Sequence, residues 1–552
     1  MIKSGWVYSY GMGFWGPNGH DGIWHIALAQ SLAKGSWQMP IFASDTIQNY
    51  HIGFDLVLAW IYKLTRIGFL DLYFQILPPV FAFFIGLTAY KFVHAWKKSH
   101  SQAFWATFFV YFGGSWGWLI TFLRSGDIGG ESLFWSQQSI STLVNPPFAL
   151  SILVIFAALW VLIQGLKTKD KRLLILSTFL FGILIQIKVY AGVLVLAGLF
   201  VSGIGRMLKR EGIDLIKVFL GATLLSILLF SPVSDSVGQT IRFKPFWFLE
   251  EMMASNDRFF WPKMASAIAN YKLAGSWFKL SLAYGLSFLL FWYGNLGTRF
   301  IKEPYVFRWF QKPKKLPWIE IFLACVILAG VVIPLFFVQS GTSWNTIQFM
   351  YYSLMLSGIL GGVYLGQFLE KTNLNTLLLN GVKVTVVVLT IPTTFGTLWY
   401  HYLPSRPPAK VSREELAALH FLSQQPDGVV LTQPFNKKLA DEAVTNPPRP
   451  LYLYESTAYV SALSGKPTYL EDEVNLEITG YNWRERRSKL ESFLGTLNPE
   501  EARAFLLKEN ITYVYWVKSI YGPISENQKL LGKLFENQEV QIFKLSSRSP
   551  RF

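Results

Sequence analysis

The chain has 552 residues, of which 52% are hydrophobic, 17% aromatic and only 15% charged. This composition excludes a large soluble enzyme and predicts a helical protein that crosses a membrane several times. The net charge is +16. Such an excess of positive charge in a membrane protein is typical of cytoplasmic loops that face anionic lipids. The sequence has no concentrated basic stretch, which argues against a nucleic-acid partner.

Residues 1–67 precede the first long apolar run, and we expect them to form a loop with short helices beside the membrane. Within "GPNGHDGIWHIALAQ", His20, Asp21 and His25 adjoin an apolar helical stretch. Asp21 fits two roles, a general base in a glycine-rich approach and an N-cap of the helix. The i, i+4 spacing of Asp21 and His25 allows them to meet on one helix face, whereas the spacing of the two histidines argues against a zinc site.

A second polar group follows in the same loop. Asp45 is the alternative base, and His51 is a candidate contact for a sugar or phosphate. Asp55 stands at the start of an apolar helix, where it faces either a cavity or solvent.

Apolar runs of about 20 residues are long enough to span a bilayer. The predicted spans are residues 71–94, 102–123, 148–165, 216–233, 278–296, 318–338, 347–368 and 384–402. Basic clusters at 94–100, 167–172, 206–217 and 299–315 are expected on the cytoplasmic side.

Residues 173–203 lie between two of these basic clusters, so the chain must cross an even number of times there. The segment is too long for one upright span and too short for two full ones. We therefore predict two short helices that meet near Lys188, in a cavity where a broken backbone is tolerated and the lysine contacts a phosphate. The alternative is one tilted helix whose lysine reaches the headgroups.

Two further segments carry candidate substrate contacts. "TIRFKPFWF" holds Arg242 and Lys244, which suit a phosphate or, alternatively, anchor the chain at the membrane interface. "GTSWNTIQFMYYSL" holds Trp344, Asn345 and Gln348, which suit sugar hydroxyls or, alternatively, form an aromatic belt with a helix cap.

The composition becomes polar near residue 404, where prolines mark a boundary. Beyond it, helical stretches alternate with strand-like "GVVLTQP", "ITYVYWV" and "EVQIFKL". This pattern predicts a soluble α/β domain over residues 404–552, placed outside the cytoplasm by the count of spans, after a multi-span domain over 68–403. The same count places residue 1 outside, so we expect that a first transmembrane helix is missing from this sequence.

The order of these features resembles the GT-C superfamily of integral-membrane glycosyltransferases, which includes the protein O-mannosyltransferases and aminoarabinose transferases. Asp21 matches the acid of their first external loop, "GSWQMP" (35–40) the turn that follows, and "GILIQIKVYAG" (182–192) the stretch that joins two short helices. Many members carry a second acid directly after the first, whereas this chain has Gly22.

The resemblance implies an inverting hexosyl- or pentosyltransferase that moves a sugar from a polyprenyl-phosphate donor to an extracytoplasmic glycan, lipid or protein. Asp21, or alternatively Asp45, would act as the base, while His20, His25, His51, Lys188, Arg242, Lys244, Trp344, Asn345 and Gln348 would contact substrate. No cofactor is implied, and no motif supports a divalent metal. The alternatives are a lipid-linked glycan flippase or transporter, and a glycan polymerase or ligase.

Overall fold

The structure is a computed structural model in which residues 2–138, 142, 145–230, 241–340, 342–496, 498–521 and 531–545 are described. The chain divides into two compact units. One combines residues 1–78 with 404–552 and is called the N/C unit here, and the other, the helical unit, comprises residues 79–403.

A small sheet joins the two ends of the sequence within the N/C unit. Its strand order is β1 (Val7–Tyr8), β2 (Gly11–Phe14), β5 (Ala409–Val411) and β7 (Arg449–Pro450). Strands β2 and β5 pair antiparallel, with Met12 opposite Val411. The N-terminal loop and the C-terminal region, which the sequence analysis treated as separate parts, therefore belong to one folded body.

A second sheet forms the α/β part of the same unit, in the order β6 (Val429–Leu431), β8 (Ile511–Val517), β10 (Val540–Leu545) and β9 (Leu531–Glu536). Strands β6, β8 and β10 confirm the three strand-like patterns. The sequence analysis missed β9, an edge strand whose side chains are mostly exposed. Around the two sheets lie the remaining helices of the C-terminal part: α19 (Arg413–Ser423), α20 (Lys437–Ala443), α21 (Tyr459–Ser464), α22 (Glu473–Thr479), α23 (Trp483–Gly495), α24 (Pro499–Lys508) and α25 (Lys518–Tyr521).

Helix α19 begins with a capping box. The Ser412 hydroxyl accepts a hydrogen bond from the Glu415 N–H at 3.0 Å, and the Glu415 carboxylate accepts one from the Ser412 N–H at 3.3 Å. Two unsatisfied donors of the helix start are thereby paired. The cap is buried, and burial raises the pKa of Glu415 from its ordinary value of 4.5 to about 7, although the Ser412 N–H opposes this rise.

The raised pKa of Glu415 makes stability depend on pH. The folded protein holds the proton between pH 4.5 and about 7 while the unfolded chain has lost it, so the free energy of unfolding falls across this window, by at most about 1.4 kcal/mol per pH unit. We expect the Glu415→Gln variant, which cannot titrate and keeps an oxygen for the cap, to show a flatter dependence. Thermal unfolding of both proteins between pH 4.5 and 8 measures the difference, and equal slopes would contradict the assignment.

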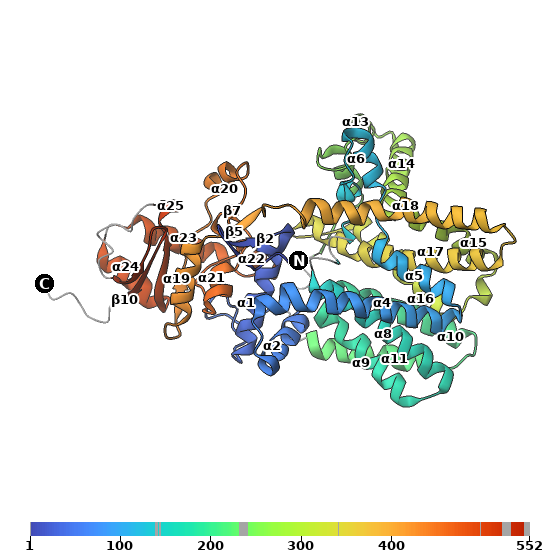
Figure 1. Cartoon of the computed structure of the whole chain (residues 1–552), viewed down its shortest axis with the longest axis horizontal. Coiled ribbons are helices and arrows are strands. Elements are labelled where there is room, and N and C mark those ends of the chain that lie inside the picture. The colour runs from blue at the N-terminus through green and yellow to red at the C-terminus, as the bar shows by residue number, and fades with distance from the viewer. Residues whose placement is uncertain are drawn as a thin grey trace. The chain divides into compact units, whose positions relative to one another are not determined.

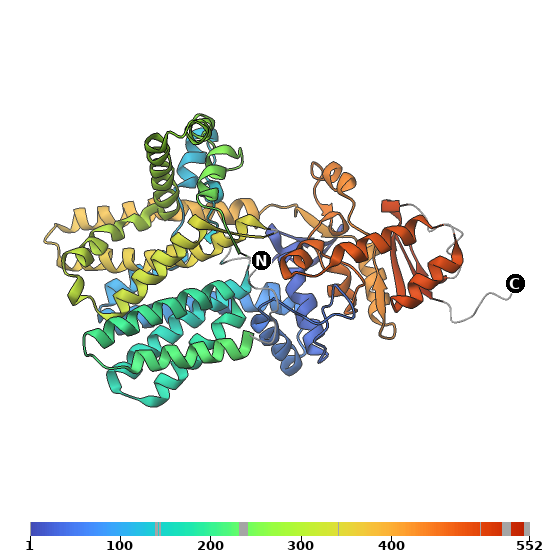
Figure 2. The same cartoon turned by 180° about the vertical axis from the view of Figure 1, so that it is seen from behind.

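The helical unit is built from long apolar helices. Figure 1 shows α4, α5, α16, α17 and α18 running alongside one another, and Figure 2 shows the same bundle from behind. By length and composition, six helical segments among the described residues could cross a membrane: Phe69–Lys97, Pro146–Thr168, Val189–Leu208, Trp318–Phe336, Ser343–Lys371 and Thr376–His401. These segments contain α4 (Leu77–Lys97), α8 (Pro146–Thr168), α10 (Val189–Leu208), α16 (Trp318–Phe336), α17 (Gln348–Lys371) and α18 (Thr376–His401). The chain is thus a multi-pass membrane protein.

Three predicted spans are not among the candidate spans of the described residues. The run at 102–123 is broken into α5 (His100–Phe112) and α6 (Gly117–Ser125), which are bent by 49° and make a seventh span only if counted together. The run at 216–233 contains α11 (Asp214–Phe230), whose 17 residues extend to the end of this described stretch; residues 231–233 lie outside the described part, so this span stays a prediction.

The third difference is α14 (Trp277–Leu296), which is not among the candidate spans although residues 278–296 were predicted to be one. In both views, α14 and α13 (Pro262–Leu273) stand apart from the long helices and run across their direction. Ile268 of α13 packs against Leu280 and Ala283 of α14. The apolar run therefore covers a neighbouring helix in a hairpin of its own.

The basic segment 299–315 also differs in part from the expectation of a solvated loop. Arg299 is buried, and its guanidinium donates to the carbonyls of Leu296 at 2.9 Å and Asn295 at 2.6 Å and to the side chain of Gln138. Lys302 is buried as well and pairs with Glu303 at 2.6 Å. The exposed cations of this segment are therefore those from Arg308 onward.

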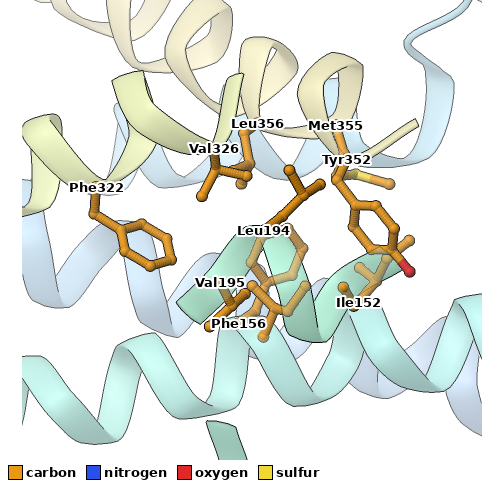
Figure 3. A pocket seen from close by; sticks show the side chains of 11 residues that line it. Ile152, Phe156, Leu194, Val195, Phe322, Val326, Tyr352, Met355 and Leu356 are labelled. Atoms are coloured by element: carbon orange, nitrogen blue, oxygen red, sulfur yellow. The ribbon is translucent and has the colours of Figure 1, made fainter. Parts of the chain in front are cut away.

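A small apolar cavity lies in the core of the helical unit, between α8, α10, α16 and α17 (Figure 3). Its volume is about 10 Å³, and Tyr352 is the one lining residue whose side chain carries an oxygen or nitrogen atom; its hydroxyl is 2.7 Å from the Ser151 hydroxyl. A space of this size holds at most one water molecule. We therefore regard the cavity as a packing gap and not as a substrate site.

Candidate functional site

Asp21 is the first residue of α1 (Asp21–Ala33), and His20 occupies the N-cap position. The N-cap position, which the sequence suggested for Asp21, is therefore held by the residue before it. The Asp21 carboxylate lies 2.9 Å from His20 Nδ1, and 43% of its side chain is exposed. An accessible carboxylate in the first turn of a helix is stabilised by the positive end of the helix dipole.

Residues from the C-terminal part of the N/C unit hold this pair in place. The Thr457 hydroxyl donates to the carbonyl of Gly19 at 3.2 Å, directly before His20. Asp472 caps α22 and is buried, which raises its pKa to about 6. Burial alone would lower the pKa of His20, but the negative charges of Asp21 and Asp472 raise it above its ordinary value. The histidine therefore holds its proton to a higher pH beside Asp21.

Close packing explains why position 22 is a glycine. A Cβ atom at this position would lie 2.8 Å from two ring carbons of Phe74 and 3.1 Å from a ring carbon of Tyr73. Contacts this short require one of the two rings to move. An acid directly after Asp21 would therefore disturb the aromatic packing beneath α1.

His25 bonds to Asp55 instead of Asp21. Its Nδ1 lies 2.7 Å from Asp55 Oδ1, with both side chains buried, and its ring stacks on Tyr73. Asp55 belongs to α2 (Gly53–Thr65), so the pair joins α1 to α2. The i, i+4 spacing thus gave the wrong partner, and the role of His25 as a substrate contact stays a prediction.

Asp45 forms an ion pair with Arg486 of α23, at 2.6 Å. The guanidinium also lies over the ring of Phe42, 3.5 Å from its centre. The alternative base is therefore engaged in a contact that joins the first loop to the C-terminal part. His51 is buried and stacks on the ring of Tyr50.

In the helical unit, Lys188 lies at a break between two helices, α9 (Lys171–Ile187) and α10. Its backbone is extended, with φ −158° and ψ 112°, and the side chain is only 5% exposed. The predicted break between two helices at Lys188 is confirmed. The helices are longer than predicted, with bounds 171–187 and 189–208 in place of 173–203, and the second, with 20 residues, is long enough to cross a membrane. The Lys188 ammonium lies 5.8 Å from the centre of the Tyr190 ring.

A chain of polar contacts continues from Tyr190. Its hydroxyl donates to Gln339 Oε1 at 3.3 Å, which also accepts from Asn345 Nδ2 at 2.9 Å. The amide of Gln348 donates in turn to Asn345 Oδ1. Asn345 and Gln348 thus form one hydrogen-bonded cluster with Gln339 and Tyr190, and the ammonium of Lys188 lies beside the Tyr190 ring of this cluster.

The remaining predicted contacts lie at the edge of this cluster. Arg242 belongs to β3 (Ile241–Phe243), which pairs with β4 (Phe337–Gln339), the strand that carries Gln339. Lys244 follows β3, and its ammonium lies 5.9 Å from the centre of the Trp247 ring. Trp344 is 53% exposed and is not part of the hydrogen-bonded chain as far as the described contacts extend.

Three residues of these sites were missed from the sequence. Tyr190 stands two residues after Lys188. Gln339 ends the short strand β4, which directly follows the strongly apolar helix α16, and a polar residue at the end of a long apolar run was the signal that could have pointed to it. Asp472 lies in "YLEDE", about 450 residues from Asp21 in the chain. The two residues come together only because both ends of the chain fold into the same unit.

Over the part of the chain that the structure describes, no group of three or more His, Cys, Asp or Glu side chains is arranged to hold a metal ion.

Comparison with known proteins identifies the fold. No protein-family model and no curated protein sequence matches the chain. The Archaeoglobus fulgidus oligosaccharyltransferase in its apo form is 12% identical, with a TM-score of 0.50, over 98% of this chain and 72% of that one. The same enzyme tethered with an acceptor peptide containing the NVT sequon gives 12% identity and a TM-score of 0.49, over 99% and 72% of the two chains.

The likeness to the apo enzyme shows that this chain has a GT-C-like oligosaccharyltransferase fold. The fold class expected from the resemblance is thereby confirmed, as is a helical membrane protein with a C-terminal α/β part. At 12% identity the likeness concerns the fold alone.

Proposed function

We propose that the protein is a membrane glycosyltransferase that moves a sugar from a polyprenyl-phosphate donor to an extracytoplasmic glycan, lipid or protein. The fold, which is similar to that of an oligosaccharyltransferase, supports the proposal, and the observation that carries it is an accessible carboxylate, Asp21, at the start of α1. On this proposal the C-terminal α/β part faces the same side of the membrane as the acceptor.

Asp21 takes the proton from the acceptor hydroxyl as that oxygen attacks the anomeric carbon of the sugar. The bond from the anomeric carbon to the donor phosphate breaks, and the electron pair leaves with the phosphate. Attack from the face opposite the leaving group inverts the anomeric configuration. His20 orients the carboxylate through the 2.9 Å contact.

The leaving phosphate gains negative charge, which a cation stabilises. Lys188 is the residue that we assign to this role, because it is an ammonium group at a helix break and not in a regular helix. Asn345 and Gln348 supply amide groups for the hydroxyls of the sugar or the phosphate oxygens.

The proposal is tested with the purified full chain in lipid nanodiscs, assayed against a panel of polyprenyl-phosphate sugars with added Mg²⁺ or Mn²⁺ and with a chelator. We expect transfer of one sugar to an acceptor and release of polyprenyl phosphate. Movement of an intact lipid-linked glycan across vesicles without bond cleavage would instead identify a flippase, and growth of a glycan chain on the lipid would identify a polymerase.

A further inference from the structure

A basic groove opens at one end of the helical unit, with a volume of about 410 Å³. It lies between the end of α4, the start of α16, the end of α17 and α15 (Glu303–Gln311). Five cations line it, against the single carboxylate of Glu320: Lys97, Arg308, Lys312, Lys315 and Lys371. A groove with this excess of positive charge suits an anion.

The carboxylate of Glu320 is already engaged. It accepts hydrogen bonds from Lys97 Nζ at 3.1 Å, from the Tyr305 hydroxyl at 2.6 Å and from Trp309 Nε1 at 2.8 Å. Glu320 therefore balances Lys97 and leaves the other lysines uncompensated. Lys312, Lys315 and Lys371 are exposed, and none of them forms an ion pair with any residue that the structure describes.

The position of the groove relative to the candidate spans indicates its depth in the membrane. The span Phe69–Lys97 and the span Ser343–Lys371 both end in residues that line it, and the span Trp318–Phe336 begins two residues before Glu320. The ends of spanning helices lie at the level of the lipid headgroups. The groove is therefore at the height of lipid phosphates.

Helix α15 supports this placement. It buries Tyr305 and Trp309 against Glu320, while Phe307 and Phe310 are 62% and 77% exposed. A short helix with aromatic side chains on its outer face and cations beside them is typical of a helix that lies in the membrane interface. The acyl chains of a lipid would contact the phenylalanines when its headgroup occupies the groove.

We propose that this groove binds the phosphate headgroup of an anionic membrane lipid, through Lys312, Lys315 and Lys371, with Arg308 beside them. Ammonium and guanidinium groups are the usual partners of phosphate oxygens. A soluble phosphate shares the headgroup chemistry, but it gains nothing from the exposed aromatic side chains of α15. The inference is independent of the glycosyltransferase proposal, because no candidate catalytic residue lines the groove.

The test uses the full chain in a neutral detergent, with phosphatidylglycerol, phosphatidylcholine and inorganic phosphate as probes. Binding is measured by native mass spectrometry and by the shift of the unfolding temperature. We expect phosphatidylglycerol to bind and stabilise the protein, and the Lys312→Gln, Lys315→Gln, Lys371→Gln triple variant to bind it roughly 100-fold more weakly, since each lysine near a lipid surface contributes about a fivefold effect.

A matched control removes three other exposed cations near a span end, Lys169, Lys171 and Arg172, which line no part of the groove. This control should bind phosphatidylglycerol like the unaltered protein. Equal losses of phosphatidylglycerol binding in both variants would show that the lipid is attracted by positive charge in general and not bound in the groove, and would overturn the proposal. Unchanged binding in the first variant, or equal stabilisation by phosphatidylcholine or by inorganic phosphate, would overturn it as well.

Discussion

Replacing Asp21 with asparagine is expected to lower turnover by about 10²–10⁴, the usual loss when a general base is removed. Asparagine keeps the size of the side chain and a polar group near His20 Nδ1, which lies 2.9 Å from the carboxylate. We therefore expect the variant to fold normally and to bind the donor, but not to deprotonate the acceptor. Single-turnover assays with a polyprenyl-phosphate sugar measure the loss separately from binding.

Asp45→Asn is the matched control. Asp45 is the other acid of the first loop with a partly exposed side chain, and its carboxylate pairs with Arg486 at 2.6 Å. Losing an ion pair that is partly exposed to solvent costs at most about 1 kcal/mol. A milder defect than that of Asp21→Asn is expected. If Asp45→Asn is inactive and Asp21→Asn is not, the base has been assigned to the wrong acid; if neither matters, the glycosyltransferase proposal fails.

The sequence was most informative where a feature is local. The break at Lys188 followed from the length of an apolar segment between two basic clusters, and the strands β6, β8 and β10 followed from alternation. These patterns arise from the rise per residue of helices and from the two faces of a strand. They need no knowledge of distant parts of the chain.

The sequence was least informative where distant segments pair. The partner of His25 is Asp55, 30 residues away, and the partner of Asp45 is Arg486, 441 residues away. Nothing in the local pattern of either acid indicates such a partner. Similarly, the run at 278–296 has the length of a span but is not among the candidate spans, and its first part packs on α13, a contact that apolarity alone does not specify.

Replacing Lys188 with methionine is expected to weaken binding of the polyprenyl-phosphate donor by about 10- to 150-fold, the equivalent of one hydrogen bond to a charged group. Methionine has a similar length and is apolar, and the extended backbone at position 188 suits any residue. The break between α9 and α10 should therefore persist. Equilibrium binding is measured in the Asp21→Asn background, so that turnover does not consume the donor.

Two companion variants separate the charge from its position. Lys188→Arg retains the charge and should keep most of the affinity, although the planar guanidinium fits the site of an ammonium imperfectly. Lys244→Met removes an exposed cation near the ring of Trp247, where water competes for the phosphate, so a smaller loss is expected. Donor affinity that is unchanged in Lys188→Met would show that the lysine does not bind the donor phosphate, and a lowered unfolding temperature in the same variant would show that it stabilises the α9–α10 break instead.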